Sequence, residues 1–341
     1  MRLSSGDSFQ TRFRKEHKHG LGIEQTDINW EGKEFSYWPE MSHDEIIKAF
    51  LANGIDLSAV VPQPFKEGRW EIKRDRCFIG PVWVSAGTGS SVTVGARPGP
   101  VWEEIIPEVI YLPGLRGNPD RTYPATAAGG AYSGPFQAYT ASIVSEWMAE
   151  NGEIVNQLNT ELKLLELTGG VTAVRISDAQ IELHVGRLRD VPPTRPENRV
   201  NIADVGLGVS QILPVLVALH AAKPGQLVYV EQPETHLHPR AQTSLAGIFA
   251  DAAKRGVRVV VETQSSLLLL GVQTLVAKDK FDRDKVKLHW FQRDNNGKTS
   301  VQSAELDEAG RFGDWPQDFD DVALETQKEY LDASSKRLFA Q

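Results

Sequence analysis

The sequence predicts an α/β fold with a mainly parallel sheet flanked by helices. Two apolar runs, Gln226–Glu231 and Val257–Glu262, have the length and composition of buried strands, and an amphipathic helical segment, Arg240–Arg255, separates them. Strands that are apolar along their whole length are typical of parallel sheets, because helices cover both faces of such sheets. A strand, a helix and a second strand in this order predict a βαβ unit.

Further elements on both sides of this unit extend the α/β pattern. A helix is expected from Gly206–Ser210 to about Ala222, and Gly256 fits the residue that follows the end of the Arg240–Arg255 helix. The other expected elements are a strand at Glu108–Leu112, a helix from about Gln137 to Asn159, paired strands at Val171–Ile176 and Gln180–Val185, a helix from Ser265 to about Val276, and a hairpin of Val286–Arg293 and Thr299–Leu306 around the turn Asp294–Gly297.

The composition is that of a folded, water-facing protein. Of its 341 residues, 40% are hydrophobic and 24% are charged, and no apolar stretch reaches the roughly 18 residues needed to cross a bilayer. The lone Cys77 excludes an internal disulfide, and no apolar signal segment opens the chain, so we expect a cytoplasmic protein without membrane contacts. A net charge of −8 argues against a polycation that coats nucleic acid. The basic run Arg12–His19 fits a solvated segment or a contact with DNA or a partner.

The segment Gln226–Pro239 is the strongest candidate for chemistry, because its apolar strand ends in acidic groups. Open α/β folds bind their ligands at the carboxyl ends of parallel strands, and carboxylates placed there can hold Mg²⁺. The alternative is a plain strand end followed by a helix entry at Pro239. The polar residues in question are Glu231, Gln232, Glu234, His236 and His238.

This segment resembles the Walker B and D-loop region of the ABC/SMC/RecF group of P-loop ATPases, in particular the branch related to Old-type nucleases. The resemblance implies an ABC/RecF-like fold, ATP and Mg²⁺ as cofactors, and Glu231 as the residue that orders the metal. It places Gln232 where the family usually has the glutamate that activates water. An amide cannot accept a proton, so Gln232 is expected to be a poor general base, and Glu234 is a candidate for part of that work.

A second segment, Asn201–Gln211, places glycines directly before a helix. Glycines let the backbone approach a phosphate, and the N-terminus of the helix offers free N–H groups and a positive dipole end. The segment resembles the ABC signature loop, which reaches across a dimer to the γ-phosphate. The alternative to a nucleotide contact is a purely structural role, as a tight turn that leads into a buried helix. The residues expected at the nucleotide are Gly206, Gly208, Ser210 and Gln211, together with His236 and His238.

A third segment, Val259–Ser266, resembles the family's switch region, which usually sets a histidine against the γ-phosphate. Here Gln264 occupies that position. Its amide can donate a hydrogen bond but carries no titratable proton. Gln232 and Gln264 together make slow or absent hydrolysis an expectation of the sequence. Weaker resemblances to the same family lie at Tyr111–Arg116, which is similar to the loop after the inner strand, and at Gly310–Pro316, which is similar to the C-terminal tail.

The sequence holds no G-x-x-x-x-G-K-[ST] segment, the Walker A loop that cradles phosphates. The nearest match, Gly297-Lys298-Thr299, closes a β-turn and has Gln292 where the first glycine belongs. A truncated start, a partner chain that carries the loop, and a degenerate member of the family all explain its absence. An exposed apolar face or edge of the sheet is therefore expected.

The resemblance divides the chain into three parts: a loop-rich region at residues 1–104, interpreted as a remnant of the first lobe, an ATPase lobe at 105–325, and a tail at 326–341. It implies a role in DNA repair or anti-phage defence, as a homodimer or with a partner chain, and with a nuclease or DNA as further partners. Two alternatives stay open. One is a non-catalytic assembly module; the other is a metal-dependent nuclease or hydrolase built on Glu231, Glu234, His236, His238 and Glu262.

Overall fold

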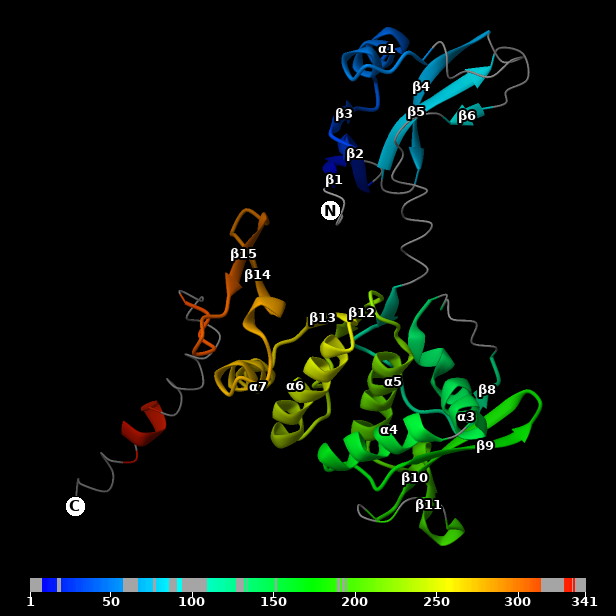
Figure 1. The fold of residues 1–341 in the computed structure, drawn as a ribbon, viewed down its shortest axis with the longest axis vertical. Coiled ribbons are helices and arrows are strands. Elements are labelled where there is room, and N and C mark those ends of the chain that lie inside the picture. Colours follow the sequence, from blue (N-terminus) through cyan, green and yellow to red (C-terminus); the bar gives the residue numbers. More distant parts are fainter. Residues whose placement is uncertain are drawn as a thin grey trace. The chain divides into compact units, whose positions relative to one another are not determined.

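The computed structural model describes residues 8–16, 20–57, 67–75, 78–85, 91–93, 109–126, 132, 134–150, 152–188, 191, 193, 195–313, 328–332 and 334. The chain divides into two compact units, Met1–Ile106 and Pro107–Gln341, and each has a hydrophobic core of its own. Cys77, residues 127–131 and most of the tail at 326–341 lie outside the described residues. Figure 1 labels the elements of both units.

The first unit contains more strand than the sequence suggested. Its sheets are antiparallel and helix α1 lies between them in the chain, with a capping box formed by Ser42 and Glu45. Residues Arg12–Glu16 of the charged run form part of an edge strand, in which Arg12, Phe13 and Arg14 are exposed and the earlier residue Phe9 is buried. The elements are β1 (Ser8–Glu16), β2 (Gly20–Trp30), β3 (Lys33–Tyr37), α1 (His43–Ala52), β4 (Gly68–Asp75), β5 (Phe78–Ser85) and β6 (Ser91–Thr93).

The second unit is built around a parallel sheet of three strands in the order β13-β12-β7. These strands are β7 (Ile110–Leu112), β12 (Leu227–Glu231) and β13 (Arg258–Glu262), and α6 (Pro239–Lys254) connects the last two. Val230 pairs with Leu112 on one side and with Val261 on the other. The predicted βαβ unit is thereby confirmed.

Helices cover one face of this sheet. Helix α5 (Leu207–Ala221) packs against β7 and β12, and α6 packs against β13. Residues 211–219 of α5 are all buried, which is why its sequence is apolar all round. Helix α7 (Ser266–Ala277) packs against α6. Figure 1 shows α5 and α6 side by side below the strands.

The expected single helix from Gln137 to Asn159 is wrong, because the structure divides it. A 3₁₀ turn (Phe136–Tyr139) leads into α3 (Thr140–Glu150), and α4 (Glu153–Leu164) begins after Gly152. Gly152 has φ of 69°, a left-handed conformation that glycine adopts without steric cost and that ends the preceding helix.

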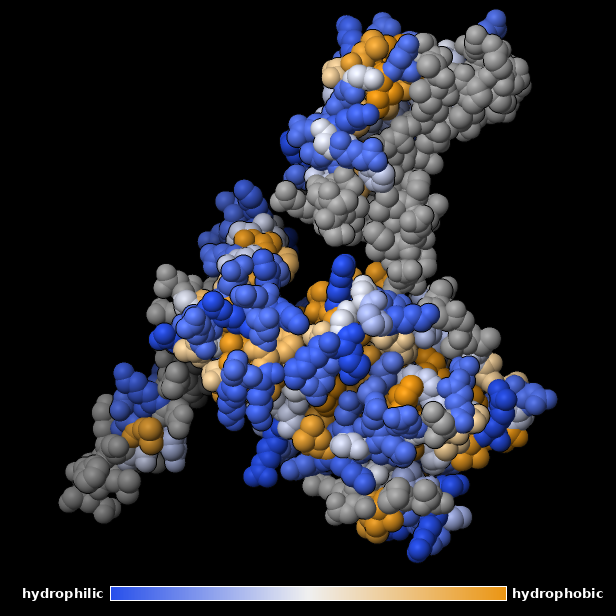
Figure 2. Space-filling model, in the orientation of Figure 1, coloured by the Kyte–Doolittle hydropathy of each residue, from blue (hydrophilic) through white to orange (hydrophobic). Residues whose placement is uncertain are grey.

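The other face of the parallel sheet is open. Tyr111 and Tyr229 are half-buried there, Glu262 is exposed, and Val260 is 47% exposed. Strand β13 is also the edge of the sheet, with no further strand paired to it in the part of the chain that is described. Among the described residues, the sheet therefore has the expected exposed edge, and the face beside it is partly exposed. Figure 2 shows the apolar residues that reach the surface on the side of the molecule in view.

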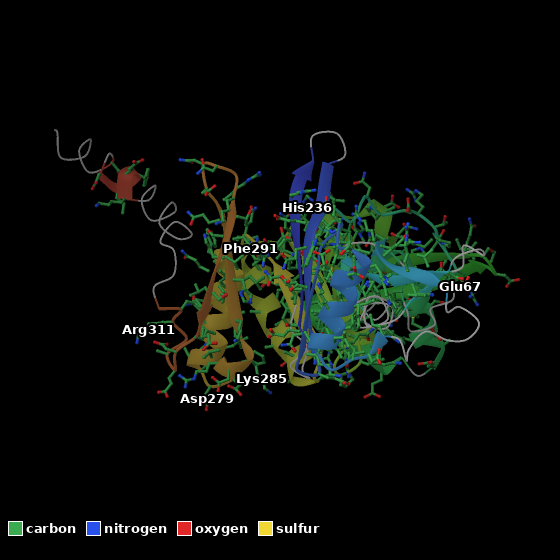
Figure 3. The ribbon with its side chains drawn as sticks, turned by 90° about the horizontal axis from the view of Figure 1, so that it is seen from above. Glu67, His236, Asp279, Lys285, Phe291 and Arg311 are labelled. Carbon is green, nitrogen blue, oxygen red and sulfur yellow. The ribbon has the colours of Figure 1, made fainter. Side chains whose placement is uncertain are left out.

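Two antiparallel sheets complete the second unit. Strand β10 pairs with β8, β9 and β11, and the β14–β15 ribbon forms the predicted hairpin. Phe291 lies along this ribbon, away from Asp279 and Lys285 in the segment between α7 and β14 (Figure 3). No helix in the described ranges is both long and apolar enough to cross a membrane. The strands are β8 (Tyr123–Pro124), β9 (Val171–Ser177), β10 (Gln180–Gly186), β11 (Arg199–Asn201), β14 (Lys287–Arg293) and β15 (Thr299–Glu305).

Candidate functional site

Glu231 is the last residue of β12 and is held by two hydrogen bonds from neighbouring segments. The Tyr111 hydroxyl donates to its Oε1 at 2.9 Å, and the backbone N–H of Gly114 donates to its Oε2 at 3.0 Å. Both donors belong to β7 and the loop that follows it. The carboxylate is thus fixed at the carboxyl edge of the sheet, where the sequence placed it.

Glu262 stands beside Glu231, because the parallel strands pair these two residues in register. The Tyr229 hydroxyl donates to Oε2 of Glu262 at 3.1 Å, and the rings of Tyr229 and Tyr111 stack with centroids 5.6 Å apart. The sequence reading gave Glu262 a role only in the metal-hydrolase alternative. Two apolar runs of equal length on either side of one helix predict parallel strands that end side by side, and this pattern could have placed Glu262 next to Glu231.

The two tyrosines have raised pKa values in this acidic surrounding. Burial raises the pKa of Tyr229 to about 12, and its hydrogen bond to Glu262 adds to the shift. The hydrogen bond to Glu231 is the main cause that raises the pKa of Tyr111. A hydroxyl that donates to a carboxylate loses that bond when it ionises and gains a like charge as a neighbour.

Gln232 adopts a left-handed backbone conformation with φ of 43°. Its N–H donates to the carbonyl of Glu262 at 2.7 Å, which turns the chain sharply after β12. Residues other than glycine incur about 1–2 kcal/mol in this region, and such strain is often found at functional sites. The side chain of Gln232 lies against Gly114, in the loop after β7.

Glu234 connects the turn after β12 to the loop after β13. Its Oε1 accepts a hydrogen bond from the backbone N–H of Gln264 at 2.9 Å, so the structure brings these two predicted residues together. The second oxygen, Oε2, is buried and has no hydrogen-bond partner among the described residues. A buried carboxylate oxygen without a protein partner is costly, and this one is free to accept a further hydrogen bond.

The glycines of the second segment lie in a pocket of about 700 Å³ with the histidines of the first. Gly206 is the N-cap of α5 and makes no side-chain capping bond, and Gly208 lies so close to the next segment that a Cβ would be 3.1 Å from the carbonyl oxygen of His236. His236 and His238 are exposed at this pocket, and Arg187 adds a guanidinium to its lining. The helix N-terminus and Arg187 suit an anion, while Glu166 and Asp204 add two carboxylates to the lining.

Two residues assigned to this loop point elsewhere. The Ser210 hydroxyl donates to the carbonyl of Leu207 at 2.9 Å. Gln211 is only 5% exposed, and its amide donates to the carbonyl of Gly117 at 2.7 Å. Neither residue lines the pocket, so the loop presents mainly backbone to it.

His238 also has a structural role. It is the N-cap of α6, where its Nδ1 accepts from the N–H of Arg240 at 3.3 Å, and Pro239 follows in the first turn. His236 has φ of 64° and makes the reversal between the strand and the helix. Within the described ranges, no three histidine, cysteine or acidic side chains are grouped to hold a metal ion. The metal-hydrolase alternative therefore lacks a ligand set in this part of the chain.

Arg116 is a residue that the sequence did not single out for a role. It is 8% exposed, and its guanidinium donates to four backbone carbonyls, which belong to Pro113, Gln211, Glu231 and Gln232. These acceptors come from the loop after β7, the helix α5 and the end of β12. No local pattern identifies such contacts, since two of the acceptors lie 95 and 115 residues away along the chain.

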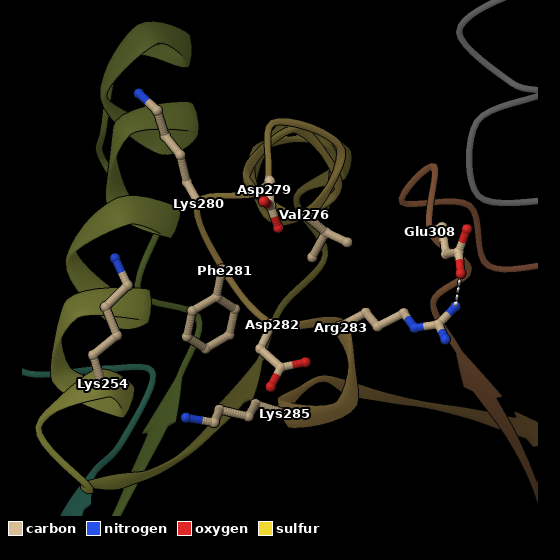
Figure 4. A pocket seen from close by; sticks show the side chains of 9 residues that line it. All are labelled: Lys254, Val276, Asp279, Lys280, Phe281, Asp282, Arg283, Lys285 and Glu308. Atoms are coloured by element: carbon tan, nitrogen blue, oxygen red, sulfur yellow. Dashed lines mark ion pairs between the residues drawn. The ribbon is translucent and has the colours of Figure 1, made fainter.

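A second pocket, of about 470 Å³, lies at the ends of α6 and α7 and is separate from these residues. Figure 4 shows lysines and acids around Phe281, with Arg283 paired to Glu308 at 3.9 Å. Lysines near helix C-termini are favoured by the helix dipole, which accounts for this cluster without a ligand. The side chains are Lys254, Val276, Asp279, Lys280, Phe281, Asp282, Arg283, Lys285 and Glu308.

Comparison with known proteins places a family match on the centre of the site. Residues 175–270 match the model described as AAA domain, putative AbiEii toxin, Type IV TA system. This range includes α5, β12, α6 and β13. No curated protein matches the chain.

Solved structures of SMC head domains resemble the chain at low identity. The SMC head domain from Thermotoga maritima is 11% identical, with 90% of this chain and 100% of that chain covered and a TM-score of 0.35. The SMC head bound to the C-winged helix domain of ScpA is 10% identical, with 89% and 76% covered and a TM-score of 0.38. A structure from work on ATP-driven dimerization of SMC ATPases is 13% identical, with 54% and 96% covered and a TM-score of 0.36. The family match is confined to residues 175–270, which is less than half of the chain.

Proposed function

We propose that this chain is a nucleotide-responsive subunit of the RecF/SMC-like ATPase type, in which Mg-ATP acts as a conformational switch. The observation that carries the proposal is the direct connection between two sites of one lobe. The β12 strand ends at Glu231, and within five residues the chain reaches His236 in the pocket of Gly206 and Gly208. One short segment therefore joins a carboxylate that could hold a cation to the pocket whose glycines could bind an anion.

The residues at the sheet edge fit a magnesium ion. Mg²⁺ prefers oxygen ligands and is usually held by one or two carboxylates together with phosphates and water. Glu231 would hold it, and Glu262 in the neighbouring register position adds a second carboxylate. The bound ion would neutralise phosphate charge. The hydrogen bonds from Tyr111 and Gly114 hold Glu231 in place before any ion arrives.

The open side of the sheet supports completion by another chain. Strand β13 has no partner on its outer side in the described part of the chain, and β14 begins a separate two-stranded ribbon after helix α7. In Figure 1 this ribbon lies on the β13 side of the sheet. Parallel sheets are normally covered on both faces, whereas Val260 and the two tyrosines remain accessible here. We infer that a strand and a phosphate-binding loop from a partner chain of different sequence complete this side.

Hydrolysis is proposed to be slow. Gln232 and Gln264 carry amides at the two positions where a proton acceptor is useful, so Glu234 is the general-base candidate that remains. The unpaired Oε2 of Glu234 supports this choice. By analogy with the family, the biological setting is DNA repair or phage defence, beside a nuclease or DNA; the family description refers to a toxin of a toxin–antitoxin system.

Calorimetric titration of the full chain with Mg-ATP tests this proposal. The expected result is weak binding, above the micromolar range, that Glu231→Gln weakens further and that Glu305→Gln on the exposed β15 strand leaves unchanged. Co-expression with chains encoded beside it is expected to tighten binding. Sub-micromolar affinity of the isolated chain would contradict the incomplete site.

The second candidate is a non-catalytic assembly module. Its supporting observation is the pair of amides at Gln232 and Gln264, which removes titratable groups from the expected chemistry. If neither the chain nor its complexes bind any nucleotide, while the complexes still form, this candidate replaces the first.

A further inference from the structure

We infer that Arg116 is a positioning residue that couples the N-terminal end of helix α5 to the acidic end of strand β12. The inference deepens the proposed function, on which its biological meaning rests, but the coupling itself is a property of the fold. It can therefore be tested without nucleotide.

The contacts of Arg116 span the two parts of the candidate site. Its Nε donates to the carbonyl of Gln211 in α5 at 2.8 Å, while Nη1 and Nη2 donate to the carbonyls of Glu231 and Gln232 at 3.0 and 3.2 Å. The bond to Pro113, at 2.8 Å, holds the guanidinium to its own loop. One rigid, planar group thus fixes the spacing between the helix that begins at the pocket and the strand that carries the carboxylate.

Helix α5 also donates a hydrogen bond to the loop that carries Arg116. The Gln211 amide donates to the carbonyl of Gly117, so α5 and the Arg116 loop are joined at two points. The same loop donates from Gly114 to the Glu231 carboxylate. A shift of α5 therefore moves the loop, and the loop moves both the main chain and the side chain of Glu231.

The chemistry of the contact favours positioning over stability. Arg116 makes no ion pair in the described part of the chain, and burial lowers its pKa while the charges of Glu234 and Glu231 oppose that shift. A buried charge whose hydrogen bonds go only to neutral carbonyls is costly to desolvate, and apolar packing generally stabilises at least as well. What the guanidinium offers in addition is several donors in a fixed plane, which lysine cannot reproduce.

The experiment is hydrogen–deuterium exchange of the full-length chain, read by mass spectrometry. Arg116→Lys is expected to accelerate exchange about tenfold in two separate peptides, residues 208–213 and 231–237, while β9 and β10 keep their rates. The matched control is Arg121→Lys, which changes an exposed arginine that is paired with Asp204. This control is expected to alter neither peptide.

Coupling is separated from simple loss of stability by a double-mutant cycle. Gln211→Ala is expected to accelerate exchange at residues 231–237 by several-fold when Arg116 is present and to add little when Arg116 is lysine. Additive effects, or equal acceleration throughout the second unit, would overturn the inference. If Arg116→Lys fails to fold, exchange in the Gln211→Ala variant is the test. An unchanged exchange rate at residues 231–237 in that variant contradicts the coupling. Loss of nucleotide binding bears on the proposed function and leaves this result intact.

Discussion

At the scale of single residues, the site is distinguished by conformations and contacts that a sequence does not display. Glu231 and Gly208 could be selected from their pattern, because an acid after an apolar strand and glycines before a helix have local causes. Glu262 and Arg116 could not, because their roles depend on strand register and on carbonyls from distant segments. Local chemistry is readable from residue types, whereas long-range geometry is not.

The left-handed backbone of Gln232 leads to a prediction about stability. Gln232→Gly is expected to stabilise the second unit by about 0.5–1 kcal/mol, because relief of the left-handed strain exceeds the added entropy of the unfolded chain. Urea unfolding measures this change. Glu31→Gly, at a turn with φ of 50° in the first unit, is the matched control and is expected to behave alike in its own unit. Destabilisation at Gln232 alone would show that its side chain stabilises the turn.

The pKa of Tyr229 leads to a prediction about pH. A folded-state pKa near 12, above the usual value of about 10, contributes stability that is fully present below pH 10 and is lost as pH rises towards 12. Tyr229→Phe is expected to remove a hydroxyl that ionises near pH 12 in an ultraviolet titration. Glu262→Gln is expected to lower the pKa of Tyr229 only in part, since burial is the larger cause of the shift. If the pKa of Tyr229 returned to about 10 in this variant, the hydrogen bond and not burial would be the main cause.

At the scale of elements, the accuracy of the sequence reading followed the strength of the local signal. Strands β12 and β13 were located to within a residue, because near-continuous apolar runs of this length have few alternatives. The α3–α4 break was missed although Gly152 marks it, since the apolar pattern continues on both sides. Strand β1 was missed because charged residues on its exposed face hide the alternation.

Glycines in the helices give a prediction at this scale. Gly271 in α7 leaves room for α6, since a Cβ there would lie 2.8 Å from the Ala246 Cβ and 2.8 Å from the Thr243 carbonyl oxygen. Gly271→Ala is therefore expected to destabilise the second unit by about 1–3 kcal/mol in urea unfolding.

Gly247→Ala is the control for this substitution, because Gly247 lies in the interior of α6 with open space around it. It is expected to stabilise by about 0.5–1 kcal/mol, as alanine is the better helix former. Equal effects at both positions would show that α6 and α7 separate easily.

At the scale of the whole molecule, the two units have separate cores and are expected to unfold separately. Phe50→Ala removes a ring that is 1% exposed in the core of the first unit and is expected to cost that unit about 3–5 kcal/mol. In calorimetry, only the transition of the first unit should shift. Leu245→Ala, in the core of the second unit, is expected to shift only the other transition. Joint shifts would reveal one cooperative molecule.

The open edge of β13 carries its own protection against unwanted association. Its centre is Val259-Val260-Val261, a run that can template β-aggregation, but Arg258 and Glu262 bound it on either side. If copies of this strand stacked in parallel and in register, arginine would lie on arginine and glutamate on glutamate. A partner strand of different sequence does not meet that repulsion. The charges that frame the edge thus discourage fibrils of identical chains while leaving the edge available for a specific strand.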